Sequence, residues 1–164
     1  MASDWERIVR EHGPMVFTTA KRVLGQSAEA EDVAQDVLLE AFRLNQTQPV
    51  RSWGGFLRRL ATCRALDRLR VQKKSISLNG MDVKDYGHGP DQAAIAKELA
   101  GRLRQALAQL PRREGEVFCL RYFEDLSYQQ IGEILGTLPG AVAQALHKAR
   151  ARLEELLAEV DSNC

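Results

Sequence analysis

Residues 126–139 have the sequence LSYQQIGEILGTLP, and this stretch decides the fold class. Ser127, followed three residues later by Gln130, forms a capping box, which begins a helix. Gly136 stands where a helix end favours a left-handed residue, and Pro139 suits the first turn of a second helix. Apolar residues at helical spacing continue the second helix. The stretch therefore predicts a helix-turn-helix across residues 127–157.

This helix-turn-helix has two interpretations. Ile131 and Leu135 would pack against Val142 and Leu146, and the second helix would present its polar N-terminal face to a DNA major groove. An ordinary helical hairpin has the same spacing. The spacing alone does not separate a DNA-binding motif from a hairpin.

The rest of the chain also has helical periodicity. Apolar residues recur at helical spacing over residues 8–24, 33–42, 53–69, 99–110 and 117–123. Pro49 indicates a loop over residues 45–52. Asn, Gly and Pro residues indicate a flexible linker over residues 76–92. The sequence thus predicts an all-α protein with two small helical domains, residues 1–75 and 93–164.

The composition excludes several classes of protein. The chain has 164 residues, 45% hydrophobic and 27% charged, which suits a globular protein. No apolar run approaches the roughly 18 residues of a membrane span, and no secretion signal begins the chain, so we expect a cytoplasmic location. The three cysteines are far apart and the three histidines are dispersed. We therefore expect no metal site, no cofactor and no enzymatic activity.

The charges are segregated along the chain. Residues 46–75 contain eight Lys or Arg and one Asp, whereas residues 1–45 contain eight acidic and five basic residues. The arginines of residues 53–74 alternate with apolar positions, so this helix would have one packed and one cationic face. A cationic helix beside an exposed Trp53 suits phosphate contact and base stacking on single-stranded DNA. A solvated surface is the alternative, which the scarcity of acids on the same helix disfavours.

An acidic stripe precedes the basic helix. Asp32, Asp36 and Glu40 are four residues apart and lie on one face of a helix. A solvated face is one interpretation, and a docking surface for a basic partner is the other. No histidine or second carboxylate pair joins the stripe to make a metal site.

Four segments together resemble one family. Residues 31–43 (EDVAQDVLLEAFR) and 53–70 (WGGFLRRLATCRALDRLR) resemble region two of sigma-70 family factors. Residues 110–131 (LPRREGEVFCLRYFEDLSYQQI) and 146–153 (LHKARARL) resemble region four of the extracytoplasmic-function group. The chain departs from the family pattern at Cys63, Leu138 and residues 143–145, so its recognition helix offers few side chains to DNA.

The resemblance implies an alternative sigma factor that directs RNA polymerase core to promoter DNA and is held inactive by an anti-sigma factor. The implied polymerase-binding residues are Asp32, Gln35, Asp36 and Glu40. The residues implied to bind the minus-ten element are Arg51, Trp53, Arg58, Arg59, Arg64, Arg68 and Arg70. Those implied to bind the minus-thirty-five element are Gln144, His147, Lys148 and Arg150.

A second function belongs to a different class. A non-sigma helix-turn-helix transcriptional regulator would combine the same C-terminal motif with an N-terminal helical sensor or dimerisation domain. The basic helix favours the sigma factor, because a sensor bundle has no need of a strongly cationic helix.

Overall fold

The computed structural model describes residues 2–79 and 92–162. In this part of the chain all the regular secondary structure is helical. The all-α prediction is confirmed. The helices are α1 (Ala2–Leu24), α2 (Ser27–Thr47), α3 (Trp53–Asn79), α4 (Gln92–Leu107), α5 (Arg112–Tyr122), α6 (Tyr128–Leu135) and α7 (Pro139–Ser162). Most of the predicted linker, residues 80–91, lies outside the described residues, so the predicted domain limits stay a prediction.

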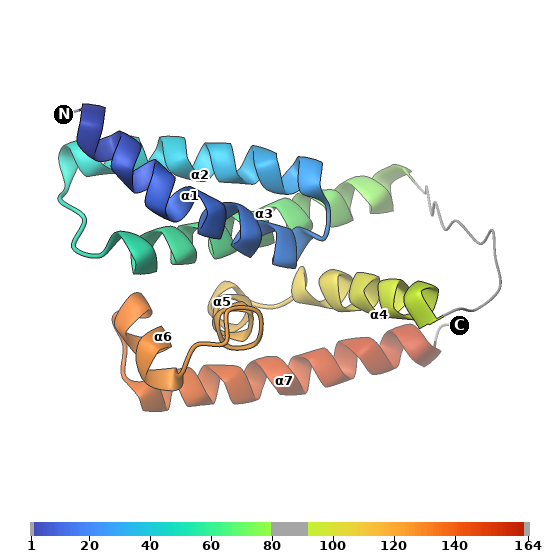
Figure 1. Cartoon of the computed structure of the whole chain (residues 1–164). Coiled ribbons are helices and arrows are strands. Elements are labelled where there is room, and N and C mark those ends of the chain that lie inside the picture. Colours follow the sequence, from blue (N-terminus) through green and yellow to red (C-terminus); the bar gives the residue numbers. More distant parts are fainter. Residues whose placement is uncertain (1, 80–91, 163–164) are drawn as a thin grey trace.

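Helices α1, α2 and α3 form an N-terminal unit (Figure 1). Their inward faces bury residues such as Val16, Val37 and Leu57, which provide the apolar stripe expected from the spacing. Gly25 joins α1 to α2 with a φ of 80°, a left-handed conformation that glycine adopts without strain.

Helices α2 and α3 continue several residues into segments that were predicted as loop and linker. Helix α2 continues through Thr47, so the observed loop begins three residues after the start of the predicted loop, residues 45–52. Helix α3 runs to Asn79, four residues into the predicted linker. The two extensions, residues 45–47 and 76–79, contain neither proline nor glycine. No helix-breaking residue therefore ends either helix earlier.

Helices α4 to α7 form a C-terminal unit that contains the predicted helix-turn-helix. The Ser127–Gln130 capping box is present, Gly136 ends α6 with a φ of 70°, and Pro139 begins α7. A buried apolar cluster joins α5, α6 and α7; its members are Val117, Leu120, Ile131, Leu135, Val142 and Leu146. All four residues predicted to pack the motif are therefore in its core.

Gly132 allows the close approach inside the motif. A Cβ at this position would lie 2.6 Å from the carbonyl oxygen of Thr137, which belongs to the turn backbone. We expect Gly132→Ala to lower the free energy of unfolding by about 1–3 kcal/mol, because the backbone must shift. Gly140→Ala is the control: a Cβ there meets nothing within 4 Å. Urea unfolding of both variants tests this, and equal stabilities would contradict it.

The two units share one hydrophobic core. In Figure 1 the N-terminal unit lies against the C-terminal unit, with α3 nearest to α4 and α5. The largest apolar cluster includes Leu57 and Leu66 of α3 together with Leu107, Cys119 and Leu153 of the C-terminal unit. The units are therefore packed together, which sequence periodicity did not indicate.

Candidate nucleic-acid interface

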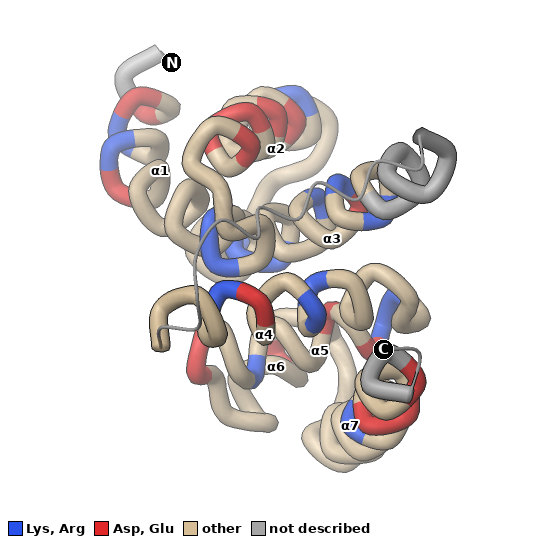
Figure 2. The backbone as a smooth tube through the Cα atoms, turned by 90° about the vertical axis from the view of Figure 1, so that its right-hand side faces the viewer, with Lys and Arg blue, Asp and Glu red and all other residues tan. Residues whose placement is uncertain are grey.

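The arginines of α3 have acidic partners in both helical units. Figure 2 shows Lys and Arg along α3, and Asp and Glu along α2. We use the name basic face for five partly buried arginines of α3: Arg58, Arg59, Arg64, Arg68 and Arg70. Each of them has an acidic partner, so this surface is not a solvated one.

Arg64 is held within the N-terminal unit. Its guanidinium group donates two hydrogen bonds to Glu40, of 2.8 and 2.7 Å, and one of 3.1 Å to Asp67. The hydrogen bonds from Arg64 hold the pKa of Glu40 below its ordinary value, and those same bonds raise the pKa of Arg64. Glu40 is therefore paired with the basic helix α3 in this structure, and its role in polymerase binding stays a prediction.

Arg68 and Arg70 are also paired inside the N-terminal unit. Arg68 donates a hydrogen bond of 2.9 Å to Glu29 and lies 3.8 Å from Asp36. Arg70 pairs with Asp67 at 3.0 Å. The scarcity of acids on α3 itself was thus misleading, because α2 supplies counter-charges from 24 to 39 residues away.

Arg58 and Arg59 differ, because their partners belong to the C-terminal unit. Arg58 pairs with Glu124 at 3.2 Å, and the Nε of Arg59 donates to Glu116 at 2.7 Å. Arg22 of α1 also pairs with Glu124. The thiol of Cys63 donates to Glu116 at 3.2 Å, and burial, assisted by Glu116, raises the pKa of this thiol to about 12.

Trp53 is not the exposed stacking platform that we expected. It is half-buried and packs edge-on against Trp5, with ring centroids 5.7 Å apart, and against Phe56, at 6.1 Å. The aromatic ring of Phe42 extends the cluster through Trp5. The apolar area of an indole favours such packing over exposure, and the whole aromatic cluster draws residues from α1, α2 and α3.

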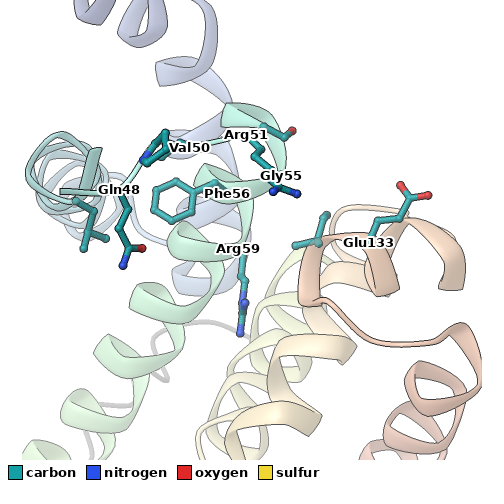
Figure 3. A pocket seen from close by; sticks show the side chains of 11 residues that line it. Gln48, Val50, Arg51, Gly55, Phe56, Arg59 and Glu133 are labelled. Atoms are coloured by element: carbon teal, nitrogen blue, oxygen red, sulfur yellow. The ribbon is translucent and has the colours of Figure 1, made fainter. Parts of the chain in front are cut away.

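A pocket of about 460 Å³ lies beside Arg51. Figure 3 shows Phe56 and Arg59 on one wall and Glu133 across from them. The lining residues are Leu44, Gln48, Pro49, Val50, Arg51, Ser52, Gly55, Phe56, Arg59, Glu133 and Ile134. The pocket therefore joins the loop before α3 to α6 of the C-terminal unit, which the sequence did not indicate.

The outer face of α2 keeps most of the predicted polymerase-binding residues accessible. Asp32, Gln35 and Asp36 are exposed, whereas Glu40 is half-buried against Arg64. Leu39 lies on the same helical face and is 50% exposed. Periodicity could have identified Leu39, because it is an apolar residue on the polar face of the helix, opposite the buried stripe.

The four predicted minus-thirty-five residues are all exposed on α7; they are Gln144, His147, Lys148 and Arg150. Arg150 donates a 2.5 Å hydrogen bond to the hydroxyl of Tyr122, which ties it to α5. Leu138, just before α7, is 77% exposed. The outward side of the recognition helix is thus polar from Gln144 onward and apolar before it.

Among the described residues, no cluster of His, Cys, Asp or Glu could hold a metal ion. No helix in that part of the chain is both long and apolar enough to cross a membrane. Cys119 is buried, and burial raises the pKa of its thiol; Cys164 lies outside the described residues.

A helix-turn-helix unit packed on a second helical unit with a cationic helix defines a class of DNA-binding transcription proteins. Comparisons with known proteins agree. The family described as Sigma-70 region 2 matches residues 8–75, and that described as Sigma-70, region 4 matches residues 100–153.

The similar proteins and structures that the comparisons found are also sigma factors. The ECF RNA polymerase sigma factor SigE of Mycolicibacterium smegmatis is 30% identical over 96% of this chain, which spans 63% of SigE. SigL of Mycobacterium tuberculosis is 30% identical, with 92% of this chain and 86% of SigL covered. The sigma factor RpoE of Bartonella quintana, solved with the anti-sigma factor NepR, has the same fold, with a TM-score of 0.55 at 22% identity over 94% of this chain and 97% of that one.

The chain therefore belongs to the extracytoplasmic-function group of the sigma-70 family, and as a member of it is an alternative RNA polymerase sigma factor. The other interpretation, a helix-turn-helix regulator with a sensor domain, has no support in these matches.

Proposed function

We propose that this sigma factor divides its work between three surfaces: the outer face of α2 binds RNA polymerase core, α3 binds the opened minus-ten strand, and α7 binds the minus-thirty-five duplex. The exposed acids of α2 and the arginines along α3 give the N-terminal unit two surfaces of different charge, and this observation carries the proposal (Figure 2). Such a distribution suits two partners of opposite charge. The chain then needs no catalytic chemistry of its own, and its place of action is the cytoplasm, where the polymerase works.

Asp32, Gln35 and Asp36 form the exposed part of the polymerase-binding surface. Leu39 adds an exposed apolar contact beside them. Glu40 contributes indirectly, since its hydrogen bonds with Arg64 hold α2 against α3.

The minus-ten strand would contact the basic face and Arg51. Arg51 is exposed at the mouth of the pocket, and Arg58 and Arg59 follow it along α3. Trp53 acts by holding the start of α3 through its aromatic neighbours. Arg64, Arg68 and Arg70 are proposed as secondary contacts, because acids of the same unit already neutralise them.

Gln144, His147, Lys148 and Arg150 are proposed to contact the minus-thirty-five duplex. Gln144 is the first of them along α7 and the nearest to the helix N-terminus, which enters the major groove in this motif. We expect the three residues after it to contact phosphates, because they lie farther from the helix N-terminus.

An anti-sigma factor is the third proposed partner. The RpoE protein of Bartonella quintana was solved in complex with the anti-sigma factor NepR. A corresponding inhibitor of this chain would cover the acidic face of α2, the C-terminal unit or both, because these surfaces are the ones that polymerase and promoter need.

We expect Asp32→Lys/Asp36→Lys to weaken binding to polymerase core at least about tenfold. Reversing two charges on a complementary surface turns electrostatic attraction into repulsion. Both side chains are exposed, and exposed substitutions change stability by only about 0.5 kcal/mol. The affinity of the labelled chain for core enzyme is the measurement.

The matched control is Glu154→Lys/Glu155→Lys, which makes the same charge change at two exposed positions of α7. This control should bind core as the wild type does. Equal affinities for wild type and the α2 variant would refute α2 as the docking surface.

A further inference from the structure

The end of the turn before α7 and the first residues of α7 carry an exposed apolar surface. Residues 138–141 (LPGA) are all exposed, and we call them the apolar tip. Leu138 is 77% exposed, more than any other large apolar residue that the structure describes. One exposed leucine is ordinary in a folded protein, so the position of the apolar tip in the motif decides whether it has a partner.

The backbone holds the apolar tip in one position. The carbonyl oxygen of Leu138 accepts hydrogen bonds from the N–H groups of Ala141 and Val142, at 3.0 and 3.2 Å. The N–H of Thr137 donates to the carbonyl oxygen of Gly132 in α6 at 2.9 Å, which fixes the preceding turn. The side chain of Val142 is buried in the core of the motif. The apolar tip is therefore an ordered part of the helix-turn-helix on its outward side.

The apolar tip continues into the residues proposed to contact DNA. Steps of three and four residues lead from Ala141 to Gln144 and on to Lys148, and all three are exposed on one face of α7. Residues 134–146 (ILGTLPGAVAQAL) contain no charged residue, and Gln144 is the exposed residue of this stretch that has a polar side chain. A partner that lies along this face of α7 therefore meets an uncharged and mostly apolar surface at the start of the helix.

The chemistry of the major groove identifies what suits this surface. In helix-turn-helix proteins the N-terminal residues of the second helix contact base edges in that groove. The apolar group that the groove offers is the C5-methyl of thymine, which small and aliphatic side chains contact. Polar edges of G·C pairs would lose water against Leu138 and gain no hydrogen bond in return. The side-chain amide of Gln144 matches N6 and N7 of adenine. Both features favour A·T pairs.

We propose that the apolar tip and Gln144 read A·T pairs of the minus-thirty-five element: Leu138 and Ala141 contact thymine methyl groups, and Gln144 donates to and accepts from an adenine. This inference rests on the proposed function of α7 and names the base pairs that the helix recognises. Lys148 and Arg150 position the helix on phosphates, which carry no sequence information.

The first measurement selects DNA with the holoenzyme formed by the full chain and RNA polymerase core. The probe is a library of promoter-length duplexes in which both promoter elements are randomised. We expect the bound fraction to contain a run of A·T pairs at the minus-thirty-five position. With Gln144→Arg, one adenine of this run should change to guanine, because arginine pairs with O6 and N7 of guanine.

The second measurement removes the methyl groups alone. Deoxyuridine replaces each thymine of the selected minus-thirty-five element; it keeps the base pair and the O4 acceptor but lacks the C5-methyl. The affinity of the wild-type holoenzyme should fall about fourfold for each methyl group in contact, as expected for one buried carbon. The readout is the ratio of the affinities for the thymine and deoxyuridine duplexes, in which any change in holoenzyme assembly cancels.

Leu138→Ser should lower this ratio about fourfold. Leu138 is the residue before α7, where serine is a favoured N-cap, so the substitution does not weaken the helix. Leu99→Ser is the matched control, because Leu99 is 57% exposed on α4, outside the helix-turn-helix. It should keep the wild-type ratio. Deoxyuridine changes the stiffness of the duplex equally for both variants, so the comparison separates methyl contact from DNA shape.

Each outcome decides the proposal. A deoxyuridine penalty that falls in Leu138→Ser and not in Leu99→Ser supports it. A G·C-rich element, an element without a deoxyuridine penalty, or a penalty that Leu138→Ser leaves unchanged overturns it, while minus-thirty-five binding by α7 stands. If no minus-thirty-five element is selected and Lys148→Ala/Arg150→Ala binds as the wild type does, the proposed function of α7 fails together with this inference, and the apolar tip is left to a protein partner.

Discussion

Replacing both Arg58 and Arg59 by alanine is expected to lower the salt dependence of open-promoter binding by the holoenzyme by about 1.4 in slope, because each phosphate contact on a single strand contributes about 0.7. Among the described residues, the ion-pair partners of these two arginines are acids of the C-terminal unit. Both guanidinium groups can contact the strand when they are not paired with these acids. Strand opening, measured with permanganate, should fall together with the slope.

The control for this result is Arg64→Ala/Arg68→Ala, which removes the same charge from the same helix. Glu40 and Glu29 already neutralise these arginines within the N-terminal unit. The control should therefore change the slope less than Arg58→Ala/Arg59→Ala does. The basic face would lose its proposed role if both double variants kept the slope and the opening of the wild type.

Leu146→Ala is expected to have the largest effect on stability. Leu146 is fully buried in the cluster that joins α5, α6 and α7. Truncating a buried leucine leaves a cavity and costs about 2–5 kcal/mol of unfolding free energy. Such a loss is a large part of the stability of a small domain. Urea unfolding followed by circular dichroism measures it, and binding to the minus-thirty-five duplex should fall with it.

Leu138→Ala supplies the matched leucine control in the same motif. Leu138 is 77% exposed, so its truncation creates no cavity, and its effect on stability should stay within about 0.5 kcal/mol. A similar loss of stability in both variants would mean that the helix-turn-helix core is not the one described.

The helix-turn-helix could be predicted in detail because its determinants are local. The bond between Ser127 and Gln130 spans three residues, and the left-handed Gly136 and the leading Pro139 act through their own backbone. The acidic stripe on α2 was predictable for the same reason, since four-residue spacing fixes one helical face. For Asp32 and Asp36 the expected exposure is confirmed.

Helix ends and aromatic exposure were less predictable. Helices α2 and α3 extend beyond the stretches that apolar periodicity marked. Apolar periodicity stops where the helix is no longer buried, but the helix itself can continue into solvent. Of the two rings that pack on Trp53, only Phe56 is a sequence neighbour. Trp5, which covers it, is 48 positions away in the chain and is brought there by the packing of α1 on α3.

The sequence by itself determined the all-helical class, the helix-turn-helix and the separation of acidic from basic segments, all of which depend on residues a few positions apart. Only the tertiary structure decided which arginines are paired, and with what. Glu116 lies 57 residues from Arg59, and Glu124 lies 102 residues from Arg22, so no local pattern links them. Ion pairing acts through space at a few ångströms, and the packing of the two units sets that distance.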